Sequence, residues 1–196
     1  IHSSRRRFAA RLNSGVRPLM QKIAALQSDS LEALRGLTID AVYSAEDYWH
    51  FFVAFRCIDG QTIVFTSEDV QIAKYFEVFP LRVAVQSAEA KPWQQLPQAE
   101  TVASSRALWR YEWLEPVEPH PDLVGSGPHF SHRVGPTPAS NSSTEPVAVL
   151  AAVELSFASG GRMLVYSSDS APLNVEFVSD SKGVSARLTE LTESAA

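Results

Sequence analysis

The chain of 196 residues has a single cysteine, Cys57, and no uninterrupted apolar run long enough to cross a membrane. One cysteine cannot form an internal disulfide, which argues against a small secreted scaffold stabilised by disulfides. A membrane-spanning helix needs about 18 or more consecutive apolar residues, so the sequence predicts no membrane span. Both absences favour a cytoplasmic protein.

The sequence also lacks the short motifs that mark common catalytic sites. It has no G-x-S-x-G nucleophile elbow, no P-loop, no dinucleotide fingerprint, no H-E-x-x-H and no paired C-x-x-C. With one cysteine, zinc and iron–sulfur sites built on cysteine are excluded. We therefore expect no cofactor, and we favour a non-enzymatic protein over an enzyme.

What the chain does contain is enough apolar material for a core. Hydrophobic residues make up 45% of the sequence and charged residues 20%, with a mean hydropathy of −0.07. This composition excludes wholesale disorder and a collagen-like structure. The length fits one compact domain, or two small similar halves that share a core.

Charge is unevenly distributed along the chain. Residues 1–28 contain six basic and no acidic side chains, whereas the remaining residues contain eleven basic and twenty-two acidic ones. The acidic body disfavours nucleic-acid binding, since phosphates would be repelled, except through the arginine-rich N-terminal arm. The arm also has the Arg/Ser-rich, acid-free composition of a transit peptide, so import into an organelle stays open.

The strongest pattern is an internal similarity. Residues 55–67 match residues 157–168 with a one-residue gap, and each stretch reads as a strand, a tight turn and a strand. Asp59-Gly60 and Gly160-Gly161 supply the residues with positive φ that two-residue hairpin turns require. Further along, a strand that begins with Pro-Leu follows each hairpin.

We therefore predict a mainly β (α+β) fold built from two similar four-stranded antiparallel meanders. The predicted strands are residues 37–43, 48–57, 62–67 and 80–85 in the first half, and residues 108–114, 147–158, 162–167 and 172–178 in the second. A lone meander leaves one apolar face in water. We expect the two meanders to pack face to face as a sandwich or to merge into one sheet.

These elements predict a single compact domain with an internal duplication. Its parts are a basic N-terminal arm with one or two helices (1–36), a first β half (37–92) and a second β half (93–196). The second half contains a long loop, 115–146, whose proline, glycine and serine content predicts no packed element. We also expect a short helix at 70–76, and either a strand or a helix at 184–191.

Acidic residues gather at one end of the first predicted meander. If its second and third strands pair antiparallel, the acids before one strand come close to the acids after the other. Such a cluster, with neighbouring aromatic anchors, suits the docking of a basic partner. The predicted partner-binding residues are Glu46, Asp47, Tyr48, Trp49, Glu68 and Asp69. Acids also flank turns simply because they solvate loop ends, and catalysis by paired carboxylates would need a walled pocket.

The long loop offers the weaker alternative of a metal site. Its candidate ligands are His120, Asp122, His129 and His132. Two imidazoles three residues apart, with a carboxylate nearby, have ligand chemistry suited to Zn²⁺ or Ni²⁺. Nothing in this Pro/Gly-rich segment fixes their geometry, so we favour a solvated loop and predict no metal.

The remaining reactive or aromatic side chains fit a core better than a site. Trp109, Tyr111 and Trp113 alternate along a predicted strand and share one face, which favours core packing over ligand stacking. Cys57 has no base or second thiol nearby in the sequence, so we expect a small buried residue rather than a nucleophile.

Together these features favour a non-enzymatic module that binds a basic protein, as an intracellular inhibitor or immunity-type protein does. A strongly acidic body speeds encounter with a cationic partner and suppresses wrong ones. One alternative is a structural or assembly subunit whose basic arm docks on a neighbouring copy, giving an oligomer. Another is a small-ligand or metal-binding protein, or an enzyme, that uses a cleft between the halves.

Overall fold

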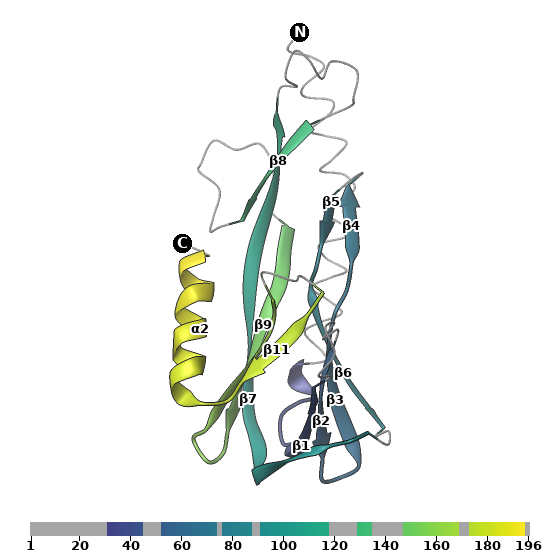
Figure 1. The fold of residues 1–196 in the computed structure, drawn as a ribbon, viewed down its shortest axis with the longest axis vertical. Coiled ribbons are helices and arrows are strands. Elements are labelled where there is room, and N and C mark those ends of the chain that lie inside the picture. Colours follow the sequence, from purple (N-terminus) through teal and green to yellow (C-terminus); the bar gives the residue numbers. More distant parts are fainter. Residues whose placement is uncertain are drawn as a thin grey trace.

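The computed structural model describes residues 31–44, 52–73, 76–87, 91–117, 129–134, 147–168 and 173–194 of the chain. Within these residues the protein is mainly β, with eleven strands and one helix, α2 (Ser181–Ser194) (Figure 1). The strands are β1 (Thr38–Ser44), β2 (Phe52–Cys57), β3 (Gln61–Ser67), β4 (Val70–Ala73), β5 (Phe76–Val78), β6 (Leu81–Ser87), β7 (Gln94–Val117), β8 (His129–Val134), β9 (Val147–Phe157), β10 (Arg162–Ser167) and β11 (Val175–Val178). The predicted mainly β fold is confirmed.

Most of these strands belong to one large antiparallel sheet. In the described part of the chain its order is β11-β10-β9-β7-β1-β2-β3-β6, with β8 paired to β7 off this path, while β4 and β5 form a separate hairpin. The 24-residue strand β7 connects the sheet, because its first residues pair with β1 and its later residues with β9 and β8. Figure 1 shows β7 running along most of the molecule.

Apolar residues alternate along the central strands and place one face of the sheet in a shared core. The buried residues of β2, β3, β9 and β10 in this core are Val53, Phe55, Cys57, Ile63, Phe65, Leu150, Val153, Leu155, Phe157, Met163 and Val165. Burying each large side chain contributes about 1.5–3 kcal/mol. The ring of Phe55 on β2 lies 5.6 Å from the ring of Phe177 on β11. The sheet therefore folds over, so that its two parts face each other across the core.

The two central hairpins turn at the glycines that the sequence indicates. Gly60 has a φ of 84° and Gly160 a φ of 89°, a region that side chains with a Cβ rarely adopt. In each turn the preceding side chain accepts the backbone N–H two residues further on, at 3.0 Å for Asp59 Oδ1 and 3.2 Å for Ser159 Oγ. The same local chemistry thus closes both hairpins.

Two segments differ from the sequence prediction. The helix expected at 70–76 is wrong, because β4 and β5 form a hairpin in which Val70 pairs with Val78. The long segment 115–146 was expected to form no packed element, yet β7 extends to Val117 and β8 pairs with it. The sequence of β8, His-Phe-Ser-His-Arg-Val, contains no proline, so every backbone N–H is available to the ladder.

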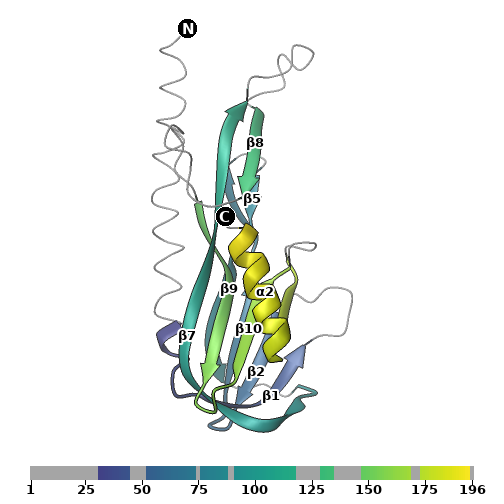
Figure 2. The ribbon, with the colours of Figure 1, turned by 90° about the vertical axis from the view of Figure 1, so that its left-hand side faces the viewer.

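The segment at 184–191 belongs to helix α2. Asp180 precedes the helix, and its Oδ1 accepts the N–H of Gly183 at 2.7 Å, as an N-cap does. Val184 is fully buried against Ala152 and Leu164, on the face of β9 and β10 opposite the shared core. Figure 2 shows α2 lying across these strands.

Only the end of the predicted N-terminal arm lies within the described residues. Residues 31–36 form a helical turn in which the N–H of Leu34 donates to the carbonyl of Leu31. Gly36, with a φ of 87°, ends this turn, as expected of a glycine after a helix. Leu34 is fully buried and anchors the turn to the shared core. The rest of the predicted N-terminal arm, residues 1–30, lies outside the described residues.

Candidate functional site

The structure describes two of the six predicted partner-binding residues. Glu68 and Asp69 directly follow β3, and the pairing of Phe52 with Thr66 places the start of β2 beside this end, as predicted. The Glu68 carboxylate lies 2.7 Å from Arg82 Nε on β6, whereas Asp69 is exposed. The other four, Glu46, Asp47, Tyr48 and Trp49, lie outside the described residues.

The structure describes two of the four candidate metal ligands. His129 and His132 belong to β8, where they pair with Val117 and Leu114. His120 and Asp122 lie outside the described residues. Where the structure describes the chain, no group of three or more His, Cys, Asp or Glu residues could hold a metal ion.

A group of aromatic rings and cations lies close to the predicted acidic end, and the sequence analysis missed it. We name it the cation–π cluster; its members are Tyr43, Phe52, Arg56, Lys91 and Trp93. The Lys91 Nζ lies 5.5 Å from the centre of the Tyr43 ring and 5.2 Å from that of Phe52. The two ring centroids are 5.6 Å apart with a tilt of 31°. One ammonium group therefore lies over two neighbouring rings at once.

The other two members of this cluster, Trp93 and Arg56, lie beside an ion pair. The Trp93 ring lies edge-on to Tyr43 at 6.3 Å, and the Arg56 guanidinium lies 5.9 Å from the Trp93 ring centre. Arg56 donates two hydrogen bonds to Asp40, of 2.9 and 2.8 Å, and a third to Gln95 at 3.2 Å. These hydrogen bonds from Arg56 hold the pKa of Asp40 below its usual value.

Only the strand register brings these rings together. Tyr43 lies opposite Ala54 on β2, which puts it on the same face as Phe52, two residues before Ala54. Lys91 and Trp93 directly precede β7, whose pairing with β1 begins at Gln94 opposite Val42. The sequence alone does not indicate the cation–π cluster, because the start of β7 was not predicted as a strand.

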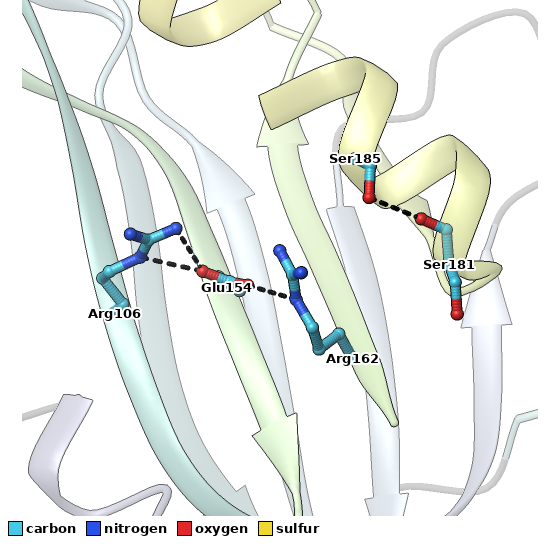
Figure 3. Close-up of polar contacts among 5 residues, drawn as sticks. All are labelled: Arg106, Glu154, Arg162, Ser181 and Ser185. Carbon is cyan, nitrogen blue, oxygen red and sulfur yellow. Dashed lines mark hydrogen bonds and ion pairs between the residues drawn. The ribbon is translucent and has the colours of Figure 1, made fainter. Parts of the chain in front are cut away.

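A second polar cluster crosses three strands of the other half. Glu154 on β9 lies between Arg106 on β7 and Arg162 on β10 (Figure 3). Arg106 Nε donates to Glu154 Oε2 at 2.8 Å, and Arg162 Nε donates to Oε1 at 2.6 Å. The Glu154 side chain is 7% exposed, against 60% and 41% for the two arginines. The carboxylate is thus buried with both oxygens paired, a cross-strand link rather than an open site.

The first residues of α2 also lie in this view. Ser185 Oγ donates to the carbonyl oxygen of Ser181 at 2.8 Å, so this hydroxyl is used within the helix (Figure 3). A further buried carboxylate, Glu112, pairs with Arg110 at 2.8 Å on β7. The ion pairs of this face therefore stabilise the sheet from within.

Most arginines of the described body are paired with carboxylates of the same chain. The pairs are Arg56–Asp40, Arg82–Glu68, Arg106–Glu154, Arg162–Glu154, Arg110–Glu112 and Arg187–Glu190. Because the body has twice as many acidic as basic residues, pairing leaves a surplus of carboxylates. That surplus sets the sign of the field that an approaching molecule meets.

Two groups of the described residues have raised pKa values. Cys57 is 2% exposed, as predicted for a buried residue, and burial raises the pKa of its thiol to about 11. Burial, with the hydrogen bond to Glu176, raises the pKa of Tyr166 to about 12. Both groups are therefore protonated at neutral pH. Trp109 packs against the shared core, as expected for its strand face.

Comparisons of the chain with protein-family models, with curated proteins and with solved structures give no match. Within the residues that the structure describes, no helix is long and apolar enough to cross a membrane.

Proposed function

We propose that the protein is a non-enzymatic binding module that covers a basic surface of another protein, in the manner of an acidic inhibitor or immunity-type protein. The observation that carries this proposal is the surplus of carboxylates left after the arginines of the body pair internally. A field of one sign speeds encounter with a cationic partner and disfavours acidic ones. Its free, buried thiol fits a reducing compartment such as the cytoplasm.

The partner-binding surface that we propose is the acidic end of the first half. It comprises Glu46, Asp47, Tyr48, Trp49, Glu68 and Asp69. Asp69 is exposed, and Glu68 is partly exposed beside Arg82, so both carboxylates can meet an approaching cation. Aromatic side chains next to such charges supply apolar contact area at low entropic cost.

We further propose that the two halves of the sheet arose by duplication, which gives the module a rigid scaffold. Thr38 and Thr101 lie opposite each other where β1 meets β7, with their hydroxyl oxygens 2.9 Å apart. The carbonyl of Thr38 accepts the N–H of Ile58 at 3.0 Å, and that of Thr101 accepts the N–H of Ala158 at 2.9 Å. Equivalent contacts on both sides of this point support the duplication.

An enzyme with a cleft between the halves has less support. The side chains that the described halves direct toward each other, such as Phe55, Phe177 and Leu155, are packed in an apolar core. An assembly subunit remains the second candidate, because the basic residues of segment 1–28 complement the acidic body of another copy. Light scattering of the full chain and of a chain beginning at Ser28 tests it: equal monomeric masses would contradict assembly through the arm.

The main proposal is tested by measuring affinity for a panel of purified basic proteins and for acidic proteins of equal size at several salt concentrations. We expect binding to the basic set that weakens with salt, and a several-fold loss in the double variant Glu68→Gln/Asp69→Gln. The matched control is Glu32→Gln/Glu190→Gln, which removes the same charge from other exposed positions. Binding that is insensitive to salt and to both double variants would overturn the proposal.

A further inference from the structure

We propose that the rings of Tyr43 and Phe52 form a recognition site for the ammonium group of a lysine side chain, and that a lysine of the basic partner replaces the chain's own Lys91 there. This inference rests on the proposed function, because it names the chemistry by which a basic partner is read. The direct observation is that an alkylammonium group of this chain already lies over both rings.

The geometry suits a cation of this kind. An ammonium is attracted to an aromatic face when it lies within about 6 Å of the ring centre. Lys91 Nζ meets this condition for both rings, at 5.5 Å from Tyr43 and 5.2 Å from Phe52. The centroids of the two rings are 5.6 Å apart and tilted by only 31°, so they offer one broad face of negative potential.

The rings are held in place by neighbours that the ligand does not need to move. Trp93 lies edge-on to Tyr43, and Arg56 covers Trp93 while bound to Asp40. Phe52 belongs to β2, where it pairs with Thr66. The site is therefore preorganised, which lowers the entropic cost of binding.

Lys91 precedes β7 and lies outside the strands of the described chain, so its backbone is not part of a sheet ladder. If a partner's ammonium group replaces that of Lys91, the charge that lies over the two rings is unchanged. The intramolecular lysine acts as a competitor, so the site favours a partner whose lysine is supported by further contacts.

Charge complementarity favours a lysine of a basic protein as the occupant. Thr66, the β3 partner of Phe52, lies two residues before Glu68, so the rings adjoin the acidic end proposed as the docking surface. A partner lysine that entered the site would bring its neighbouring positive charges toward Glu68 and Asp69. The two surfaces would then act together in one interface.

The test uses the full chain and a small probe, N-acetyl-lysine methylamide, followed by NMR of the Tyr43 and Phe52 ring resonances. We expect Lys91→Gln to bind the probe about two- to fivefold more tightly than the unchanged chain, because the competitor is gone. Adding Tyr43→Leu or Phe52→Leu to Lys91→Gln should reverse this gain. The neutral analogue N-acetyl-norleucine methylamide should not bind.

A matched control separates local from overall charge. Lys182→Gln removes one exposed lysine from α2 and should leave the probe affinity unchanged. Equal affinities of the unchanged chain and Lys91→Gln, or equal binding of the lysine and norleucine probes, would overturn the site. Probe binding as expected, combined with basic proteins that bind without regard to salt, would instead overturn the proposed function and leave the ammonium site standing.

Discussion

The two halves of the sheet carry different chemistry at corresponding positions of their outer faces. In the second half, Arg106 lies opposite Glu154, and Arg162 lies diagonally beyond it. In the first half the same places in the strand register hold Tyr43, Ala54 and Thr62. A charged row across three strands on one side therefore corresponds to an aromatic and small-residue row on the other.

The environment of each row explains this difference. The charged row lies on the face that α2 also covers, and its ion pairs link β7, β9 and β10 (Figure 3). In the first half, Ala54 is fully buried, and the long side chains of the cation–π cluster occupy this face instead. Ion pairs link strands on both faces, and in the first half they lie beside aromatic rings near the predicted acidic end.

The shared core offers the hardest test of whether the halves form one folding unit. Phe55→Ala in the first half and Leu155→Ala in the second should each lower the free energy of unfolding by about 3–5 kcal/mol, because both side chains are fully buried. Urea denaturation followed by tryptophan fluorescence and by far-UV circular dichroism should give coincident single transitions for both variants. Separate transitions would show that the halves unfold independently.

The charged row should contribute more to the free energy of unfolding than an exposed ion pair in the first half does. Glu154→Gln leaves two arginines without their shared carboxylate and should cost about 2 kcal/mol of unfolding free energy, less than a fully buried pair because both arginines are partly exposed. Glu68→Gln breaks the exposed pair with Arg82 and should cost about 0.5 kcal/mol or less. Equal losses in urea titrations would remove the contrast between the faces.

The two hairpin turns should respond alike to substitution of their glycines, in contrast to the ion pairs of the two halves. Gly60→Ala and Gly160→Ala both force a Cβ into a positive-φ position, although open space surrounds each site. Each should lower the free energy of unfolding by about 1 kcal/mol, or the melting temperature by about 2–4 °C. Differential scanning calorimetry of the two variants should give similar shifts. A loss confined to one variant would argue against equivalent turns.

The smallest expected change in unfolding free energy comes from substitutions at the register shifts in β1 and β7. Asp40 lies at the irregularity between Ile39 and Ala41, and Ala103 at that between Val102 and Ser104. Because Arg56 lowers the pKa of folded Asp40, the stability it adds is present above the unfolded value of about 3.9 and is lost as pH falls through the lowered folded value.

Unfolding free energies measured across acidic pH should therefore separate Asp40→Asn from the unchanged chain by about 0.5 kcal/mol near neutrality, a gap that closes at low pH. Ala103→Ser, the neutral control in the other half, should give no pH-dependent difference. A gap for Asp40→Asn that persists at low pH would contradict the role of the ion pair.

Local patterns were sufficient to predict the central hairpins. Alternating apolar residues and the turn glycines gave 62–67 and 162–167 as strands, close to the observed β3 and β10. They were not sufficient for 70–76, which contains β4 and the first residue of β5, two short strands that pair with each other. A four-residue strand offers too few alternations to be told from one helical turn.

The start of β7 was missed for a different reason. Residues 94–107 contain Pro97 and polar side chains, which argue against a strand. In the structure, Pro97 falls where the register between β1 and β7 shifts, a place where a missing N–H is tolerated. The cation–π cluster depends on this same pairing, so its geometry could not be predicted from segments that are far apart in the sequence.

The contact between Thr38 and Thr101 has a consequence for the order of folding. It joins positions 63 residues apart, whereas β2–β3 and β9–β10 close through tight turns. Local hairpins form in microseconds, but distant strands must first overcome a larger entropy of loop closure. During synthesis the strands of the first meander emerge before β7 is complete, so their apolar face has no cover until the second half is made.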